Sequence, residues 1–127
     1  MRKLLLVALA TIPLTQGCAA LLGVGAGVLI TQEMLDNQTY VARLELGSER
    51  MWPSAKTTLS HLSLKPIDVD DDLRVAIADI DQAKVTVAVE TYDLNQSILR
   101  VSAKKFGVAN GEIAKMVLDK ILDDVDR

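Results

Sequence analysis

The second half of the chain contains three successive runs in which apolar and polar residues alternate. In the middle run, Val85, Val87 and Val89 alternate with polar or small residues, which is the pattern of a half-buried strand. The three runs are 73–80, 84–92 and 97–106, and the turns between them are Asp81-Gln82 and 93–96. Strands joined by such short turns must be antiparallel, because a parallel crossover needs a dozen residues or more. An antiparallel meander is therefore expected.

Two segments show the apolar spacing of amphipathic helices. The first ends near Leu62, and Ser48 is a suitable N-cap, although Pro53 favours a regular helix that begins close to the proline itself. The second follows Asn110, which is also a suitable N-cap. Their apolar faces are expected to be Trp52, Ala55, Leu59 and Leu62 in the first, and Ile113, Met116, Val117 and Ile121 in the second.

Two further strands precede the meander, and together these elements define a fold class. Over 39–46 the residues alternate between two faces, with Tyr40, Ala42 and Leu44 on one of them. Ile67 and Val69 show the same alternation over a shorter stretch. One apolar sheet face is best covered by the two helices. We therefore predict an α+β fold: a two-layer sandwich, with a mostly antiparallel sheet and two helices on one face, in β-α-β-β-β-β-α order.

The beginning of the chain has the architecture of a bacterial lipoprotein leader. Arg2 and Lys3 precede an apolar run over 4–14, and the only cysteine, Cys18, directly follows the small residue Gly17. We predict a signal peptide over 1–17, cleavage between Gly17 and Cys18, a diacylglycerol on the Cys18 thiol and an acyl chain on its amine. The alternative is one uncleaved membrane helix from Leu4 to Gln32. Three residues near its middle disfavour that alternative: Pro13, Gln16 and Gly17.

The segment 18–38 is predicted to be a lipidated tether, and 39–127 a small α+β domain. Residues 19–30 are apolar and rich in glycine and alanine, and we expect them to lie at the headgroup boundary or to dip into the outer leaflet. Ala19, rather than aspartate, follows the cysteine. By analogy with lipoprotein sorting, this favours the outer membrane, facing the periplasm, if the host has two membranes.

Charge limits the partners that the domain can have. The chain has 127 residues and a net charge of −3, and all 17 acidic residues lie after Cys18. Without Arg2 and Lys3, 12 basic residues remain and the charge is −5. Nucleic acid is excluded as a partner because its phosphates need a basic patch. Electrostatic adhesion to anionic lipid is equally disfavoured, so membrane contact is expected through the lipid anchor.

The beginning and end of the chain together resemble a known family. Gly17-Cys18-Ala19-Ala20, an Ala/Gly-rich stretch, Lys105-Phe106-Gly107 and the helix over 113–121 resemble bacterial lipoproteins of the family catalogued as domain of unknown function 3568. The resemblance implies lipidation and one small α/β domain. It implies no activity, because the family has none assigned.

Groups that could support catalysis or metal binding are sparse. Asp68, Asp70 and Asp72 alternate as in the first half of a calcium loop, but Leu73 stands where that loop needs glycine. A solvated turn is therefore favoured, with metal binding a weaker hypothesis. His61 is the only histidine, so no histidine pair can form, and it is expected on a helix surface. We predict that the protein is not an enzyme and has no cofactor besides its lipid.

Three aromatic residues receive different predictions. Trp52 and Phe106 continue apolar patterns and are expected in the core. Tyr92 falls on the face opposite the valines of its strand, where it would be exposed and could mark a contact surface.

Two functions fit these observations. The first is an envelope lipoprotein whose domain binds another envelope protein as an assembly accessory. The alternative is a periplasmic lipid- or small-molecule-binding module, with an apolar groove between sheet and helices. A filled core with a distinctive surface patch would favour the first, and a large cavity beneath Trp52 and the C-terminal helix would favour the second.

Overall fold

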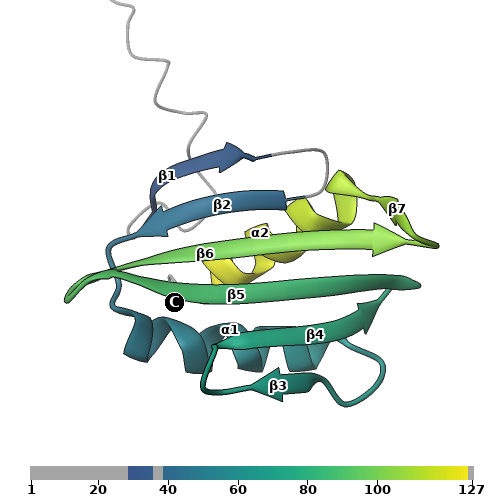
Figure 1. The fold of residues 1–127 in the computed structure, drawn as a ribbon, viewed down its shortest axis with the longest axis horizontal. Helices are drawn as coiled ribbons and strands as arrows, with labels where there is room; N and C mark the ends of the chain where they lie inside the picture. Colours follow the sequence, from purple (N-terminus) through teal and green to yellow (C-terminus); the bar gives the residue numbers. More distant parts are fainter. Residues whose placement is uncertain (1–28, 36–38, 126–127) are drawn as a thin grey trace, which may run out of the picture.

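The computed structural model describes residues 29–35 and 39–125, which form seven strands and two helices (Figure 1). In chain order the elements are β1 (Leu29–Met34), β2 (Thr39–Leu44), α1 (Ser48–Leu62), β3 (Asp68–Asp70), β4 (Val75–Ile80), β5 (Ala83–Asp93), β6 (Gln96–Lys105), β7 (Val108–Ala109) and α2 (Gly111–Val125). All paired strands are antiparallel. The predicted α+β class and antiparallel sheet are therefore confirmed.

The element order differs from the prediction by two strands. β1 lies within the segment 18–38, which was predicted to be a tether, and β7 follows β6 through a short turn. The pairing of β1 with β2 is irregular between Leu29 and Thr31, which breaks the alternation by which a strand is recognised in sequence. β7 has only two residues, too few to show any period.

The two longest strands occupy the middle of the sheet. The strand order is β1-β2-β6-β5-β4-β3, and β7 pairs with β6. β5 has 11 residues and β6 has 10, and they form one long hairpin. β2 pairs with the other edge of β6, so a strand from the start of the domain lies beside one from its end.

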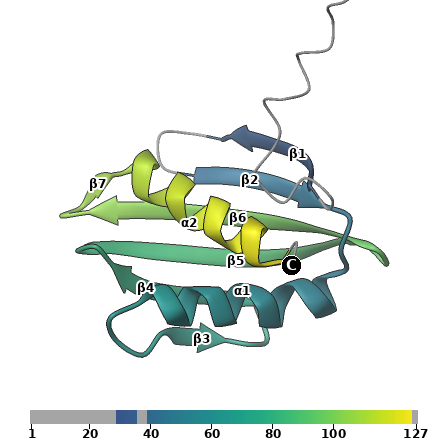
Figure 2. The ribbon, with the colours of Figure 1, turned by 180° about the vertical axis from the view of Figure 1, so that it is seen from behind.

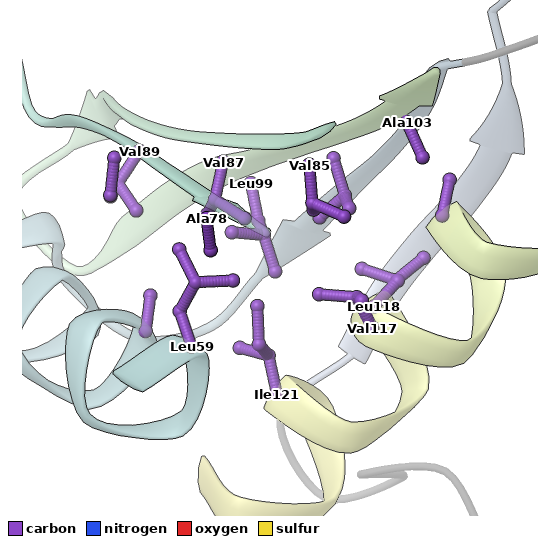
Figure 3. Packing of buried hydrophobic residues seen from close by; sticks show 14 of the residues in the cluster. Leu59, Ala78, Val85, Val87, Val89, Leu99, Ala103, Val117, Leu118 and Ile121 are labelled. Carbon is purple, nitrogen blue, oxygen red and sulfur yellow. The ribbon is translucent and has the colours of Figure 1, made fainter. Parts of the chain in front are cut away.

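Both helices lie on the same face of the sheet, and the other face is open (Figures 1 and 2). Alternate residues of β5 and β6 point toward the helices and are buried, among them Val87 and Leu99. Leu59 from α1 and Ile121 from α2 approach each other beneath these strands (Figure 3). The core is therefore the layer between the sheet and the two helices.

The first helix begins earlier than predicted. Gly47 is the N-cap and Ser48 is the first helical residue, so Pro53 lies inside the helix. Ser48 makes no capping bond, because its hydroxyl bonds the Thr91 hydroxyl at 2.8 Å and accepts a bond from Arg74. The proline is tolerated because it is exposed, as is Glu49, whose carbonyl loses its usual N–H partner.

The second helix follows the prediction more closely. The Asn110 side-chain oxygen accepts a hydrogen bond from the Ile113 N–H at 3.0 Å, which confirms the predicted cap. Ile113, Val117 and Ile121 are buried as predicted. Met116 is exposed, so its assignment to the apolar face was wrong. It lies beyond the edge of the helix face that the sheet covers.

Candidate interaction surface

The predicted lipidation site lies outside the described residues. This applies to Cys18 and Gly17, and to all of the segment 18–38 except residues 29–35. None of the helices in the described ranges is both long and apolar enough to span a bilayer.

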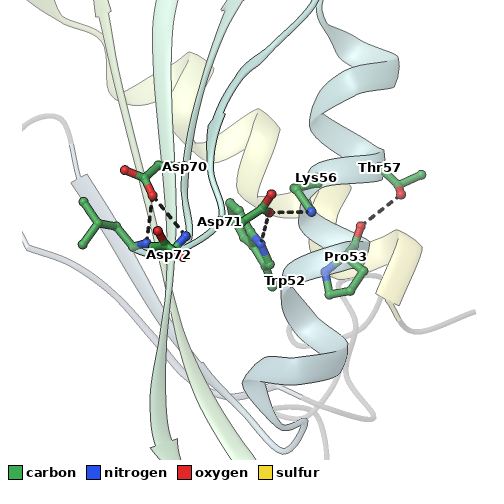
Figure 4. A network of polar contacts seen from close by, with 8 residues as sticks. Trp52, Pro53, Lys56, Thr57, Asp70, Asp71 and Asp72 are labelled. Atoms are coloured by element: carbon green, nitrogen blue, oxygen red, sulfur yellow. Dashed lines mark hydrogen bonds and ion pairs between the residues drawn. The ribbon is translucent and has the colours of Figure 1, made fainter.

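The acidic cluster covers β3 and the turn after it: Asp68 and Asp70 lie in β3, and Asp71 and Asp72 lie in the turn that leads to β4. The Asp70 carboxylate accepts hydrogen bonds from the backbone N–H groups of Asp72 and Leu73, both at 3.0 Å (Figure 4). Among the described residues, no group of three or more acidic, histidine or cysteine side chains is arranged to hold a metal ion, and Asp68, Asp70 and Asp72 do not form one.

Asp71 connects this turn to α1 through side-chain hydrogen bonds. Its Oδ1 accepts hydrogen bonds from Lys56 Nζ at 2.8 Å and from Trp52 Nε1 at 2.9 Å (Figure 4). The Lys56 ammonium also lies 5.1 Å from the centre of the Trp52 ring. The bond from Lys56, followed by the bond from Trp52, lowers the pKa of the Asp71 carboxyl. This network gives the buried indole a partner for its N–H, and it is structural.

The open face of the sheet mixes apolar and charged side chains. The strand register aligns Val41, Arg100, Ala88 and Val75 across four strands, and these side chains are only partly buried. Arg100 is held by Glu90, with 2.8 Å between Nε and Oε2. This face presents apolar area between charged groups, a composition that does not by itself distinguish an interface from ordinary protein surface.

We define the Tyr92 corner as four residues at one end of this face together with Leu94 of the adjoining β5–β6 turn, which lies beside the start of α1. The four residues are Arg43, Tyr92, Gln96 and Ile98. Tyr92 is 50% exposed, and the Arg43 guanidinium carbon lies 4.5 Å from the centre of its ring. Leu94, in the β5–β6 turn, is 89% exposed. Ile98 pairs with Arg43 across β2 and β6. The predicted exposure of Tyr92 is confirmed.

Two polar atoms in the Tyr92 corner are buried without a hydrogen-bond partner. They are Arg43 Nε and Gln96 Oε1, and the described part contains only one other such side-chain atom, Ser97 Oγ. A buried polar group without a partner costs about 1–3 kcal/mol. Both atoms are covered by neighbouring side chains of the same chain, so a partner could reach them only if those side chains moved.

In the described ranges, the layer between the sheet and the helices is filled with side chains. Leu59, Val87, Leu118 and Ile121 are fully buried between the helices and the sheet. The hollows lie on the surface instead. One of about 740 Å³ lies between α2 and the β2 edge of the sheet, and Tyr40, Met116 and charged residues of α2 line it. The filled core favours a function on the surface.

The remaining aromatic and histidine predictions have mixed outcomes. Trp52 is buried, as predicted, and His61 is exposed on α1. The core assignment of Phe106 was wrong, because the residue is 81% exposed in the turn between β6 and β7. Its backbone φ is 54°, a turn conformation that directs the side chain away from the strand faces.

Sequence reasoning identified Tyr92 but missed its two polar neighbours. Arg43 lies on the face of its strand opposite Tyr40, Ala42 and Leu44, and Gln96 lies in the range 93–96 that was expected to be a turn. Comparison of this chain with protein families, curated proteins and solved structures finds no match.

Proposed function

We propose that this protein is a lipid-anchored lipoprotein of the bacterial cell envelope, with a non-catalytic domain that binds another envelope protein. The anchor is the diacylglycerol and N-acyl chain on Cys18, at the outer membrane and facing the periplasm if the host has two membranes. The Tyr92 corner carries the proposal for the domain, because it combines an exposed tyrosine–arginine pair with the exposed side chain of Leu94.

The chemistry of this corner suits a protein partner. Tyrosine and arginine are enriched at the energetically dominant positions of protein interfaces. A partner could pack on the exposed part of the Tyr92 ring, while Leu94 supplies exposed apolar area. The two-layer arrangement supports this use, because helices on one face of the sheet leave the opposite face free.

The anchor is tested by Cys18→Ser. We expect wild-type protein to incorporate labelled palmitate and to sediment with membranes, and the variant to incorporate none. The variant should also keep its uncleaved leader, since lipoprotein processing needs the modified cysteine. Equal labelling of the two proteins would refute the anchor without affecting the proposed surface.

The interaction surface is tested by a photoreactive phenylalanine placed at Tyr92 or Leu94 in cells. Matched control positions are Ser60 and Glu112, which are exposed on the helix side of the molecule. We expect one discrete cross-linked envelope protein from the first pair only. Arg43→Ala in the same chain should weaken that cross-link. Identical products from both pairs of positions would show that the open face has no special role.

A further inference from the structure

The turn between β6 and β7 displays apolar side chains that folding does not explain. Phe106 is 81% exposed and Val108 is 68% exposed, and neither contributes to the core or packs against it. Phe106 has a φ of 54°, a left-handed conformation that is unfavourable for a bulky residue and easier for asparagine or glycine. The chain therefore retains an aromatic residue where both exposure and backbone geometry disfavour it.

Lysines without ion pairs surround this turn. Lys84 and Lys104 lie directly opposite each other on β5 and β6, an arrangement of like charges that is destabilising by itself. Lys105 follows in sequence. These are the three lysines of the described part without an ion pair, whereas the other four each lie within 4 Å of a carboxylate.

Two hydroxyl groups complete a small basic hollow beside the turn. Thr86 pairs with Ser102 next to the two opposed lysines, and the four side chains line a hollow of about 260 Å³ on the open face. Asp79 pairs with Lys84 across the other edge of β5, but its carboxylate lies 3.7 Å from Lys65 Nζ. Asp81, in the adjacent turn, is the other nearby acid. Ammonium and hydroxyl groups together match the oxygens of a phosphate.

We propose that this end of the domain docks on a membrane surface, with Phe106 and Val108 in the headgroup boundary and a lipid phosphate in the hollow between Lys84 and Lys104. An apolar tip backed by ammonium groups matches the layers of a bilayer interface, where lysines extend to the phosphates above buried apolar side chains. The negative net charge of the chain gives no sign of this arrangement, because net charge does not show how the unpaired lysines are distributed over the surface.

The proposed anchor has the length that this docking needs. Leu29 pairs with Leu44, which pairs with Ser97, so β1 begins at the end of the sheet opposite Lys104. β6 has 10 residues and spans about 33 Å. From Cys18 to Leu29 the chain advances 29 − 18 = 11 residues. Such a length reaches at most about 40 Å. A chain lipidated at Cys18 can therefore place the Phe106 turn on the same bilayer only if residues 19–28 are nearly fully extended, which differs from the position at the headgroup boundary expected for residues 19–30 from sequence.

Docking is measured by co-sedimentation of the Cys18→Ser chain, starting at residue 18, with vesicles of equal parts phosphatidylglycerol and phosphatidylcholine. Removing the lipid makes the contribution of the domain visible, and the result does not depend on whether Cys18 is acylated in cells. The test variants are Phe106→Asn, which suits the left-handed turn, and the pair Lys84→Gln/Lys104→Gln. The control pair is Lys115→Gln/Lys120→Gln on α2, which removes the same charge.

We expect the Lys84/Lys104 pair to reduce vesicle partitioning about 25-fold, because each lysine near an anionic surface contributes about a fivefold factor. Phe106→Asn should weaken partitioning while its melting temperature stays equal or rises. The control pair should bind almost as well as the parent. Equal binding by all four proteins would overturn the proposal, as would a cross-link from Phe106 to a protein in cells together with no vesicle binding by the parent.

Discussion

Gly47 and Gly107 are both required to be glycine, for unrelated physical reasons. A Cβ atom at Gly47 would lie 2.9 Å from the backbone oxygen of Leu94, which belongs to the β5–β6 turn. Gly107 has open space around it but a φ of 80°, which other residues adopt only with strain. One position is limited by close approach of two backbones, and the other by its own conformation.

We predict that Gly47→Ala lowers the free energy of unfolding by about 1–3 kcal/mol, because the helix start must move away from the turn. Gly107→Ala should cost about 1–2 kcal/mol through backbone strain alone. Urea unfolding of both variants measures these losses. A neutral Gly47→Ala would show that the turn moves freely relative to α1.

The Asp71 network predicts a pH-dependent stability. Bonds to its charged form lower the folded pKa of Asp71 below 3.8, so its stabilisation is present above the unfolded pKa and is lost as the pH falls through the folded pKa. Asp71→Asn should therefore be less stable than wild type at pH 7, with the difference shrinking below pH 4. Urea midpoints at pH 7 and pH 3 test this. A difference that grows on acidification would contradict the assignment.

Single residues were predictable where they obey a local period. Tyr92 alternates with the buried valines of β5, so its exposure followed from its position in the strand. Its contact with Arg43 could not be predicted, since it depends on β2 lying beside β6. Phe106 was misplaced because an apolar residue at the end of a strand resembles a core residue, and a positive φ leaves little trace in sequence.

At the scale of elements, α1 and α2 were identified from their apolar faces, and their starts were the uncertain part. A proline normally marks the first turn, yet Pro53 lies farther inside α1. The packing of α1 against the core decides where the helix begins. Met51 and Trp52 are buried only if the helix has begun before them. Tertiary burial therefore outweighs one missing hydrogen bond on the exposed side.

The two faces of α2 provide a direct test of this packing. Ile121 is fully buried near Leu59, so Ile121→Ala should lower the free energy of unfolding by about 2–5 kcal/mol through lost burial and a new cavity. Met116→Ala on the exposed side should change it by less than about 0.5 kcal/mol. Calorimetry or urea unfolding measures both. Similar losses would mean that α2 packs in a different rotation.

At the scale of the whole molecule, the fold class followed from short turns and amphipathic helices. The strand order did not, because nothing local to β2 specifies β6 as its neighbour. β1 was missed for a related reason. Its residues after Leu29 and Ile30 are mostly polar, and it is an edge strand that needs only one partner.

β1 sets the boundary of a stable soluble fragment. A chain that starts at residue 28 keeps the edge strand, whereas one that starts at residue 39 exposes the edge of β2. We expect the shorter fragment to melt at lower temperature and to associate at high concentration, because unpaired strand edges recruit other strands. Thermal unfolding and sedimentation velocity compare the two. Equal stability would show that β1 is dispensable.

The pairing of β2 with β6 has a consequence for how the chain is made. Residues 45–95 separate these strands, so the centre of the sheet cannot close until β6 has been synthesised. Closing so long a loop is also slow compared with forming a hairpin. An exported chain enters its translocation channel unfolded. For the proposed lipoprotein, this topology would delay folding until after passage through the channel, because most of the domain must emerge before the fold can form.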